Sequence, residues 1–172
     1  MRPPPEAHAA AKHPGTPLAG PYGHPFHPIL VTVPIGAWVA SVIFDLAGLF
    51  SAEGSAFAIG ATWLIAVGLI GALAAAVFGF LDLAIIESGT VAKRIGLTHM
   101  TINLAVVVLF VISFAVRLGA GAGEPSVMGL VVSIIALAAL GFSGWLGGKL
   151  AYQYGVRVAA ESTQIEGFRA AK

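Results

Sequence analysis

Residues 56–81, AFAIGATWLIAVGLIGALAAAVFGFL, decide the fold of this chain because they carry no charged side chain over a length that crosses a lipid bilayer. A hydrocarbon core of about 30 Å requires about 20 mostly apolar residues in a helix. Three further apolar runs reach this length, alone or with their flanks: 29–50, 102–116 and 127–150. Because no water inside a bilayer can satisfy peptide groups, each run must close its own hydrogen bonds as a helix, and none shows the alternation of barrel strands. We therefore predict an all-α polytopic membrane protein, a bundle of four transmembrane helices.

The composition supports this class and excludes several others. Of the 172 residues, 58% are hydrophobic and 10% are charged, against about 25% charged in an ordinary globular domain. The net charge of +1 and the absence of a basic cluster exclude nucleic acid as a partner, and leave the lipid bilayer. With no cysteine, the chain cannot form disulfides, iron–sulfur clusters or thiolate metal sites. Any metal must therefore bind through histidine, carboxylate or methionine.

The composition also divides the chain into three parts. Residues 1–21 are rich in proline and alanine without the apolar segment of a signal peptide, and we predict a disordered N-terminal tail. Residues 22–156 form the predicted four-helix transmembrane domain. Residues 157–172 are polar, and we expect a cytoplasmic C-terminal tail with a short surface helix around 158–168.

The basic residues predict how the bundle is oriented. Four spans place both termini and the loop between the second and third helices on one side of the membrane. That side holds eight of the nine basic residues: Arg2, Lys12, Lys93, Arg94, Lys149, Arg157, Arg169 and Lys172. The opposite side holds only Arg117. By the positive-inside rule, both termini should be cytoplasmic.

Three histidines belong to this predicted cytoplasmic end. His24 and His27 each precede a proline at the start of the first helix, and His99 stands at the start of the third. A residue before proline avoids the α conformation, so we expect an extended segment until Pro28 begins the helix. Pro34 lies inside this helix and should kink it.

Equal spacings relate these histidines to two charged residues. His27 and Asp45 are 18 residues apart, as are His99 and Arg117, and 18 residues make five whole helical turns. Each pair therefore lies on one helix face. If His27 faces His99, Asp45 should face Arg117 about 27 Å away, and we predict a structural ion pair between them.

Three segments resemble a known family: GHPFHPILVTVPIG, GFLDLAIIESGTVAKRIGLTHMTIN and GGKLAYQYGVRV. In order and spacing they are similar to the bacterial four-helix membrane proteins of DUF2231, a domain of unknown function, over residues 22–158. The resemblance implies the bacterial cytoplasmic (inner) membrane. Some members are joined to a Rieske iron–sulfur domain, which implies that electron transfer is compatible with the fold and that a Rieske-type protein is a candidate redox partner. Some relatives have histidine where Lys149 stands here.

Two hypotheses for the histidines follow. In the first, the chain is a redox component that binds haem b, with His27 and His99 as axial ligands and His24 beside them, since four-helix bundles commonly host haem. A metal ion would instead take His24, His27 and His99 together with Asp82. In the second hypothesis, the chain is a non-catalytic scaffold or accessory subunit whose histidines are structural, with His27 as the N-cap of the first helix.

Other activities have less support. Metal or proton permeation would have only Asp45 and Arg117 as polar groups in the outer half. No nucleophile, base and orienting residue are apparent, and we assign no catalytic residue.

Overall fold

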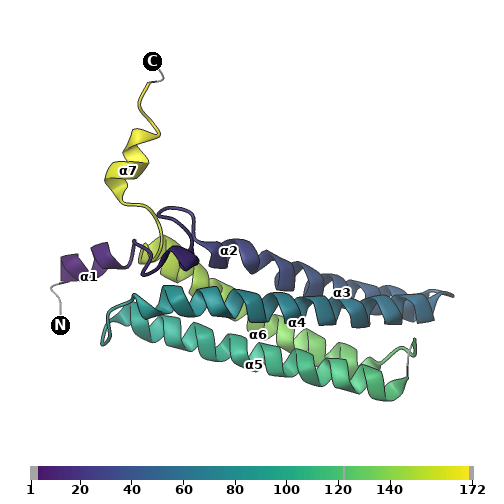
Figure 1. Ribbon diagram of the computed structural model, residues 1–172. Coiled ribbons are helices and arrows are strands. Elements are labelled where there is room, and N and C mark those ends of the chain that lie inside the picture. The colour runs from purple at the N-terminus through teal and green to yellow at the C-terminus, as the bar shows by residue number, and fades with distance from the viewer. Residues whose placement is uncertain (1–3, 122, 171–172) are drawn as a thin grey trace.

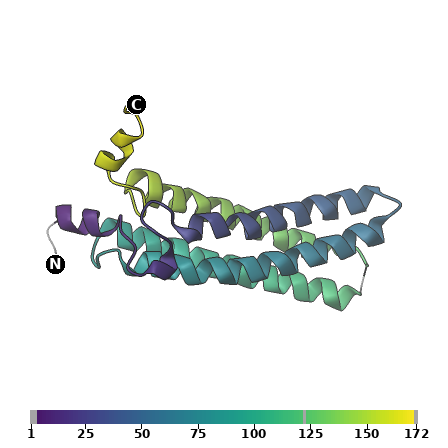
Figure 2. The same cartoon turned by 45° about the horizontal axis from the view of Figure 1, so that its top comes forward.

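The protein is a bundle of long helices that lie side by side, with both termini at the same end (Figures 1 and 2). The computed structural model describes residues 4–121 and 123–170. Its elements run in the following order: α1 (Pro4–Ala10), the short helix η1 (Pro17–Ala19), α2 (Phe26–Leu30), α3 (Thr32–Phe50), α4 (Gly54–Ala84), α5 (Val91–Ala120), α6 (Val127–Gly148), the π-helical turn η2 (Lys149–Gln153) and α7 (Glu161–Glu166). The described residues form no strand.

Within residues 4–121 and 123–170, four helices are long and apolar enough to cross a membrane, which confirms the predicted fold class. They are Phe26–Phe50, Gly54–Ala84, Val91–Ala120 and Val127–Gln153. Short connections join α3 to α4 and α5 to α6, so the bundle consists of two antiparallel hairpins (Figure 1). The α5 and α6 helices begin with side-chain caps, in which the hydroxyls of Thr90 and Ser126 accept from the N–H groups of Lys93 and Gly129.

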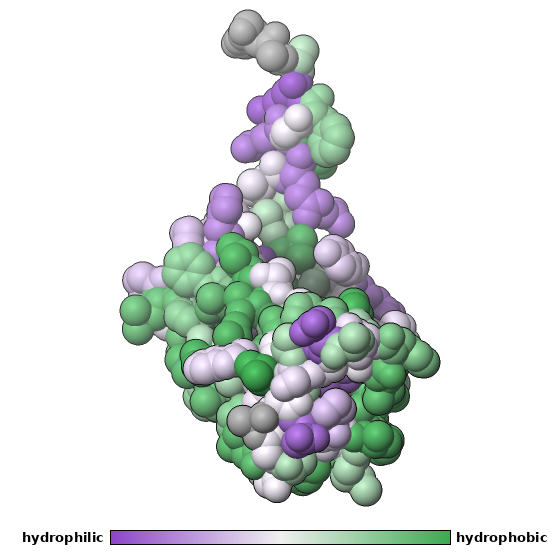
Figure 3. Space-filling view, turned by 90° about the vertical axis from the view of Figure 1, so that its right-hand side faces the viewer, coloured by the Kyte–Doolittle hydropathy of each residue, from purple (hydrophilic) through white to green (hydrophobic). Residues whose placement is uncertain are grey.

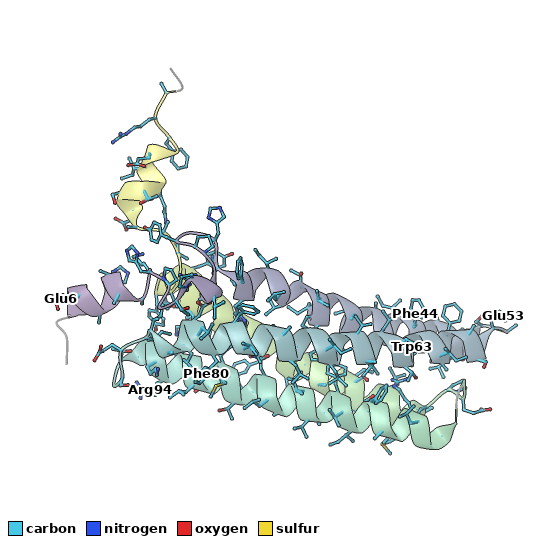
Figure 4. All side chains as sticks on the ribbon, in the orientation of Figure 1. Glu6, Phe44, Glu53, Trp63, Phe80 and Arg94 are labelled. Carbon is cyan, nitrogen blue, oxygen red and sulfur yellow. The ribbon has the colours of Figure 1, made fainter. Side chains whose placement is uncertain are left out.

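Apolar side chains cover the outside of the bundle. Phe44, Trp63 and Phe80 are exposed along its length, between Glu53 at one end and Arg94 at the other (Figure 4). Viewed from the α3–α4 loop end, hydrophobic residues surround the periphery, and hydrophilic residues gather on the loops and the projecting C-terminal segment (Figure 3). A surface of this kind is stable only against lipid, so the chain is a multi-pass membrane protein.

The first spanning helix begins earlier than the sequence predicts. Its N-cap is Pro25, so the extended segment ends before Phe26 and His27 is already helical. The prediction that Pro28 starts the helix and that His27 is its N-cap is wrong. Proline is tolerated in a first helical turn because the N–H groups there have no partner inside the helix.

Pro34 lies close to an interruption of the first spanning helix. It cannot donate to the carbonyl of Leu30, and the helix is interrupted at Val31, between α2 and α3. The hydroxyl of Thr32 donates to the Ile29 carbonyl at 2.7 Å beside this interruption. The helical segment that carries His27 is therefore short, and the kink expected at Pro34 stays a prediction.

The core of the bundle is apolar at mid-length. The rings of Trp38 and Phe110 stack with centroids 4.1 Å apart, and the indole N–H of Trp38 donates to the Ile65 carbonyl. Val106 and Ala136 complete this buried cluster. These side chains separate the polar groups at one end of the bundle from those at the other.

The terminal segments also carry structure. The segment predicted to be a disordered tail contains α1 and η1, and Ala11 and Ala19 within it are buried. In the C-terminal segment, where the sequence predicts a surface helix around 158–168, the structure has α7, whose residues are all exposed.

Candidate functional site

His27 and His99 lie next to each other at the end of the bundle that carries both termini. His27 comes from α2 and His99 from α5, and their ring centroids are 6.4 Å apart with the rings almost perpendicular, at 88°. Both residues are half-buried. His27 lies in the first turn of α2. The prediction that His99 stands at the start of the third spanning helix is wrong, because α5 begins at Val91 and His99 lies more than two turns inside it. The structure thus brings together the two histidines that the sequence proposes as a ligand pair.

Hydrogen bonds to main-chain carbonyls determine the tautomer of both rings. The Nδ1 atom of His27 lies 2.9 Å from the Ala75 carbonyl oxygen in α4, and that of His99 lies 2.8 Å from the Ser143 carbonyl oxygen in α6. A carbonyl oxygen only accepts, so each Nδ1 must carry the proton and donate. In the neutral form, each Nε2 is then unprotonated and can accept a hydrogen bond or bind a metal.

The two Nε2 atoms have different surroundings. The side-chain amide of Asn103, one helical turn after His99, lies 3.1 Å from the His99 Nε2 and 3.0 Å from the His99 carbonyl. Both contacts require donation by the amide nitrogen, so the His99 lone pair is occupied by an N–H group. Among the described residues, no side chain or main-chain group makes a hydrogen bond to the Nε2 of His27.

Two glycines leave room for the imidazole rings. A Cβ atom on Gly79 in α4 would lie 2.8 Å from the Cε1 of His27, which is closer than real Cβ contacts. A Cβ atom on Gly147 in α6 would lie 3.1 Å from the Cε1 of His99. The helices facing the histidines therefore lack side chains where the rings lie, and each ring is held between a glycine and a carbonyl.

His24 and Asp82, the other two residues of the proposed metal set, do not join this pair. His24 is exposed, and its ring makes a hydrogen bond to the Tyr22 carbonyl at 3.4 Å. Asp82 is buried at the end of α4, where it contacts Arg157. Within residues 4–121 and 123–170, no group of three or more His, Cys, Asp or Glu side chains is placed to hold a metal ion.

Arg157 is a buried residue that sequence reasoning assigned to the tail. Its Nε lies 2.8 Å from Asp82 Oδ1, an ion-pair contact at an angle outside the range of a hydrogen bond. Its Nη2 donates to the carbonyls of Ala19 and Gly20, and its main-chain N–H donates to the carbonyl of Ala11. One side chain therefore joins α4, the N-terminal segment and the C-terminal segment.

No sequence signal identifies this role of Arg157, because the groups that it joins are remote along the chain. Its backbone is in the left-handed region with φ of 61°, which a non-glycine residue rarely adopts. Close by, the main-chain N–H of Ala160 donates to the Tyr22 hydroxyl at 2.7 Å, and this hydrogen bond lowers the pKa of the Tyr22 phenol. The two terminal segments thus hold each other at this end of the bundle.

At the opposite end, the structure joins Asp45 of α3 to Arg117 of α5. Two parallel hydrogen bonds of 2.6 Å connect the guanidinium to the two carboxylate oxygens, and both side chains are buried. The Nε of Arg117 also donates to the Ser113 hydroxyl, which in turn donates to the Gly129 carbonyl in α6. The ion pair of Asp45 and Arg117 and the two histidines lie at opposite ends of the apolar core. The 18-residue spacings from His27 to Asp45 and from His99 to Arg117 predict this arrangement.

Comparison with known proteins yields one match. The family model described as "Predicted membrane protein (DUF2231)" matches residues 23–160, which include all four spans and both histidines of the pair. No curated protein and no solved structure matches the chain.

Proposed function

The chain belongs to the DUF2231 family of predicted membrane proteins, and we propose that it is a small membrane redox component that binds a metal through His27 and His99. The metal is haem iron, as in haem b, or a single transition-metal ion. The tautomers of the two rings carry this proposal. Metal-binding histidines commonly donate one ring N–H to a carbonyl, which orients the ring and leaves the other nitrogen free as a ligand. Both His27 and His99 donate from Nδ1 to a carbonyl in this way, and the Nε2 of His27 makes no hydrogen bond among the described residues.

The separation of the rings agrees with two imidazoles on one metal. With metal–nitrogen bonds of about 2.1 Å, ligation by both Nε2 atoms places the ring centroids about 6 Å apart. The observed centroid distance is 6.4 Å. Ligation also requires the amide of Asn103 to leave the Nε2 of His99, which a rotation of the Asn103 side chain achieves.

Haem makes a further demand on the bundle. Its macrocycle needs a slot between the helices beside His27 and His99, whereas a single metal ion needs only the space between the two rings. When bound, such a group supplies reversible one-electron transfer, and the role of the chain is to orient both ligands.

We place this site at the cytoplasmic face of the bacterial inner membrane. The support is the distribution of basic residues, of which eight of nine belong to the predicted cytoplasmic side. Electrons would pass between this site and a protein partner, for which a Rieske-type protein is the candidate.

The test is metal analysis together with visible spectra, oxidised and reduced, of the full chain expressed with iron and haem supplied. We expect stoichiometric metal in the parent, and its loss in His27→Ala and in His99→Ala. His24→Ala is the matched control, because this exposed histidine is outside the pair and its loss should at most weaken binding. A Soret band that shifts on reduction indicates haem, and metal without such a band indicates a single ion. A parent free of both excludes the proposal.

The contact between Asn103 and His99 favours a second candidate, a non-catalytic scaffold or accessory subunit. In this case Asn103 and Ser143 satisfy His99 completely, and the histidines hold α5 against α6 and α2 against α4. The variant Asn103→Ala separates the two candidates. If His99 binds metal, the variant retains the metal or binds it more tightly, because a competing donor has been removed. If His99 is structural, the variant is metal-free like the parent and is less stable.

A further inference from the structure

A shallow, open groove runs along the face of α5 that points away from the histidine pair, and its lining combines apolar surface with two basic side chains. Its volume is about 580 Å³, and its lining includes Thr90, Lys93, Arg94, Leu97, Thr98 and Thr101. Residues 90, 94, 97 and 101 recur every three or four positions and so form one helix face. His99 lies five residues after Arg94, about 140° around the helix. The groove is therefore separate from the proposed redox site.

The position of the groove corresponds to the headgroup layer of a bilayer. The α5 helix has 30 residues and is about 45 Å long, whereas the hydrocarbon core is about 30 Å thick. Its apolar part begins near Ile102, so the first ten residues extend into the headgroup layer. Figure 4 shows Arg94 at this end of the bundle. The groove thus runs from the level of lipid phosphates to the level where acyl chains begin.

The charged side chains in the groove are basic, and they have hydrogen-bond donors left to bind an anion. Arg94 is exposed, and no hydrogen bond or ion pair of its side chain is found among the described residues. The ammonium of Lys93 donates one hydrogen bond, to the Leu83 carbonyl at 2.9 Å, which leaves two of its three donors. The N-terminus of α5 adds a partial positive charge. No acidic side chain lines the groove.

The threonines of the groove are poor phosphate donors. The hydroxyls of Thr98 and Thr101 already donate to the carbonyls of Arg94 and Leu97 in their own helix. They can therefore only accept, for example from a hydroxyl on a lipid headgroup. The donors for a phosphate are the guanidinium of Arg94 and the ammonium of Lys93.

We propose that this groove binds an anionic phospholipid of the surrounding membrane. The phosphate lies against Arg94 and Lys93, and the glycerol and the first part of the acyl chains lie along Thr98, Leu97 and Ile102. Charge complementarity and depth in the bilayer favour this occupant over a second copy of the chain, because a twofold contact through this face would bring the Arg94 side chains of two copies together.

The experiment titrates the purified full chain in detergent with phosphatidylglycerol or phosphatidylcholine and counts bound lipid by native mass spectrometry. We expect the parent to bind phosphatidylglycerol about 25-fold more tightly, since each of the two basic residues near the anionic headgroup contributes about fivefold. Arg94→Gln should lose about fivefold of this preference, and adding Lys93→Gln should remove most of the rest. Arg169→Gln removes the same charge from the exposed C-terminal segment and should change nothing.

Several outcomes contradict the lipid site. If the parent binds phosphatidylglycerol and phosphatidylcholine equally, the lipid site is excluded, and no variant is needed for this conclusion. If Arg94→Gln and Arg169→Gln lower the preference for phosphatidylglycerol equally, the preference depends on the net charge of the protein and not on this groove. The parent contains no cysteine, so Thr98→Cys tests the other occupant. A disulfide-linked dimer of this variant in phosphatidylglycerol bilayers shows that a second copy covers the face.

Discussion

Arg117 and Asp45 form a buried bidentate ion pair, with both nitrogen–oxygen distances at 2.6 Å. The pair ties α5 of the second hairpin to α3 of the first, at the end opposite the histidines. Arg117 continues the contact to α6 through Ser113. Three of the four spanning segments therefore meet at one charged group, which fixes their relative heights.

Removing one member of this ion pair should leave the other charge buried near hydrocarbon without a partner. We expect Asp45→Ala or Arg117→Ala to lower the free energy of unfolding by about 3 kcal/mol or more, and replacement of both by apolar residues to recover much of the loss. Unfolding in mixed detergent, followed by circular dichroism, measures all three variants. A double variant whose loss equals the sum of the single losses would show that the two side chains are not coupled.

Loss of the Arg157 side chain should release the N-terminal segment. Arg157→Ala removes the ion pair with Asp82 and two hydrogen bonds to the carbonyls of Ala19 and Gly20. Charge-assisted hydrogen bonds contribute enough that opening of this segment should increase about tenfold or more. Trypsin cleavage after Lys12 in purified protein reports the opening, and Arg169→Ala is the control. Rapid cleavage of the parent, equal to that of Arg157→Ala, would instead match the disordered tail that composition predicts.

A side chain at Gly79 or Gly147 should displace the facing histidine. Gly79→Ala places a Cβ 2.8 Å from His27, and Gly147→Ala places one 3.1 Å from His99. We expect each variant to lose about 1–3 kcal/mol of stability, as overpacked cores do. Gly144→Ala is the matched control, because nothing lies within 4 Å of its added Cβ. Detergent unfolding of the three variants tests this prediction, and equal stability of all three would mean that the rings have room to move.

The orientation of the bundle can be measured directly because the parent has no cysteine. Ala52→Cys and Glu124→Cys lie in the two loops that we predict to be outside the cell, and Ser88→Cys lies in the loop predicted to be cytoplasmic. An impermeant thiol reagent added to intact cells should label the first two and leave the third unlabelled. The reverse labelling pattern would place the histidine pair on the outer side.

The fold follows from the sequence because the bilayer leaves few alternatives. Apolar runs near 20 residues have to become helices in lipid, so their number and order could be predicted from residues 29–150 alone. The helix ends were less predictable. The sequence suggested a helix start at Pro28, but α2 begins at Phe26 because the first turn has no need of the missing proline N–H.

The sequence predicted that His27 and His99 lie together, but it also placed His24 and Asp82 with them, and these two residues lie apart from the pair. Spacing by whole turns relates His27 to Asp45 and His99 to Arg117, and the structure places both cross-helix pairs in contact. The spacing of residues along one helix does not predict contacts with other helices. It could not show that the Ala75 and Ser143 carbonyls determine the ring tautomers, or that the Asn103 amide binds the Nε2 of His99.

What the sequence determined by itself is the membrane class, the four helices and the faces on which polar residues recur, because these depend on transfer free energies and on helical periodicity along one segment. Only the tertiary structure decided which polar groups meet. Arg157 shows the reason: its partners Asp82, Ala11 and Ala19 come from segments far apart along the chain, and a buried charge takes whichever partners the packed helices bring within reach.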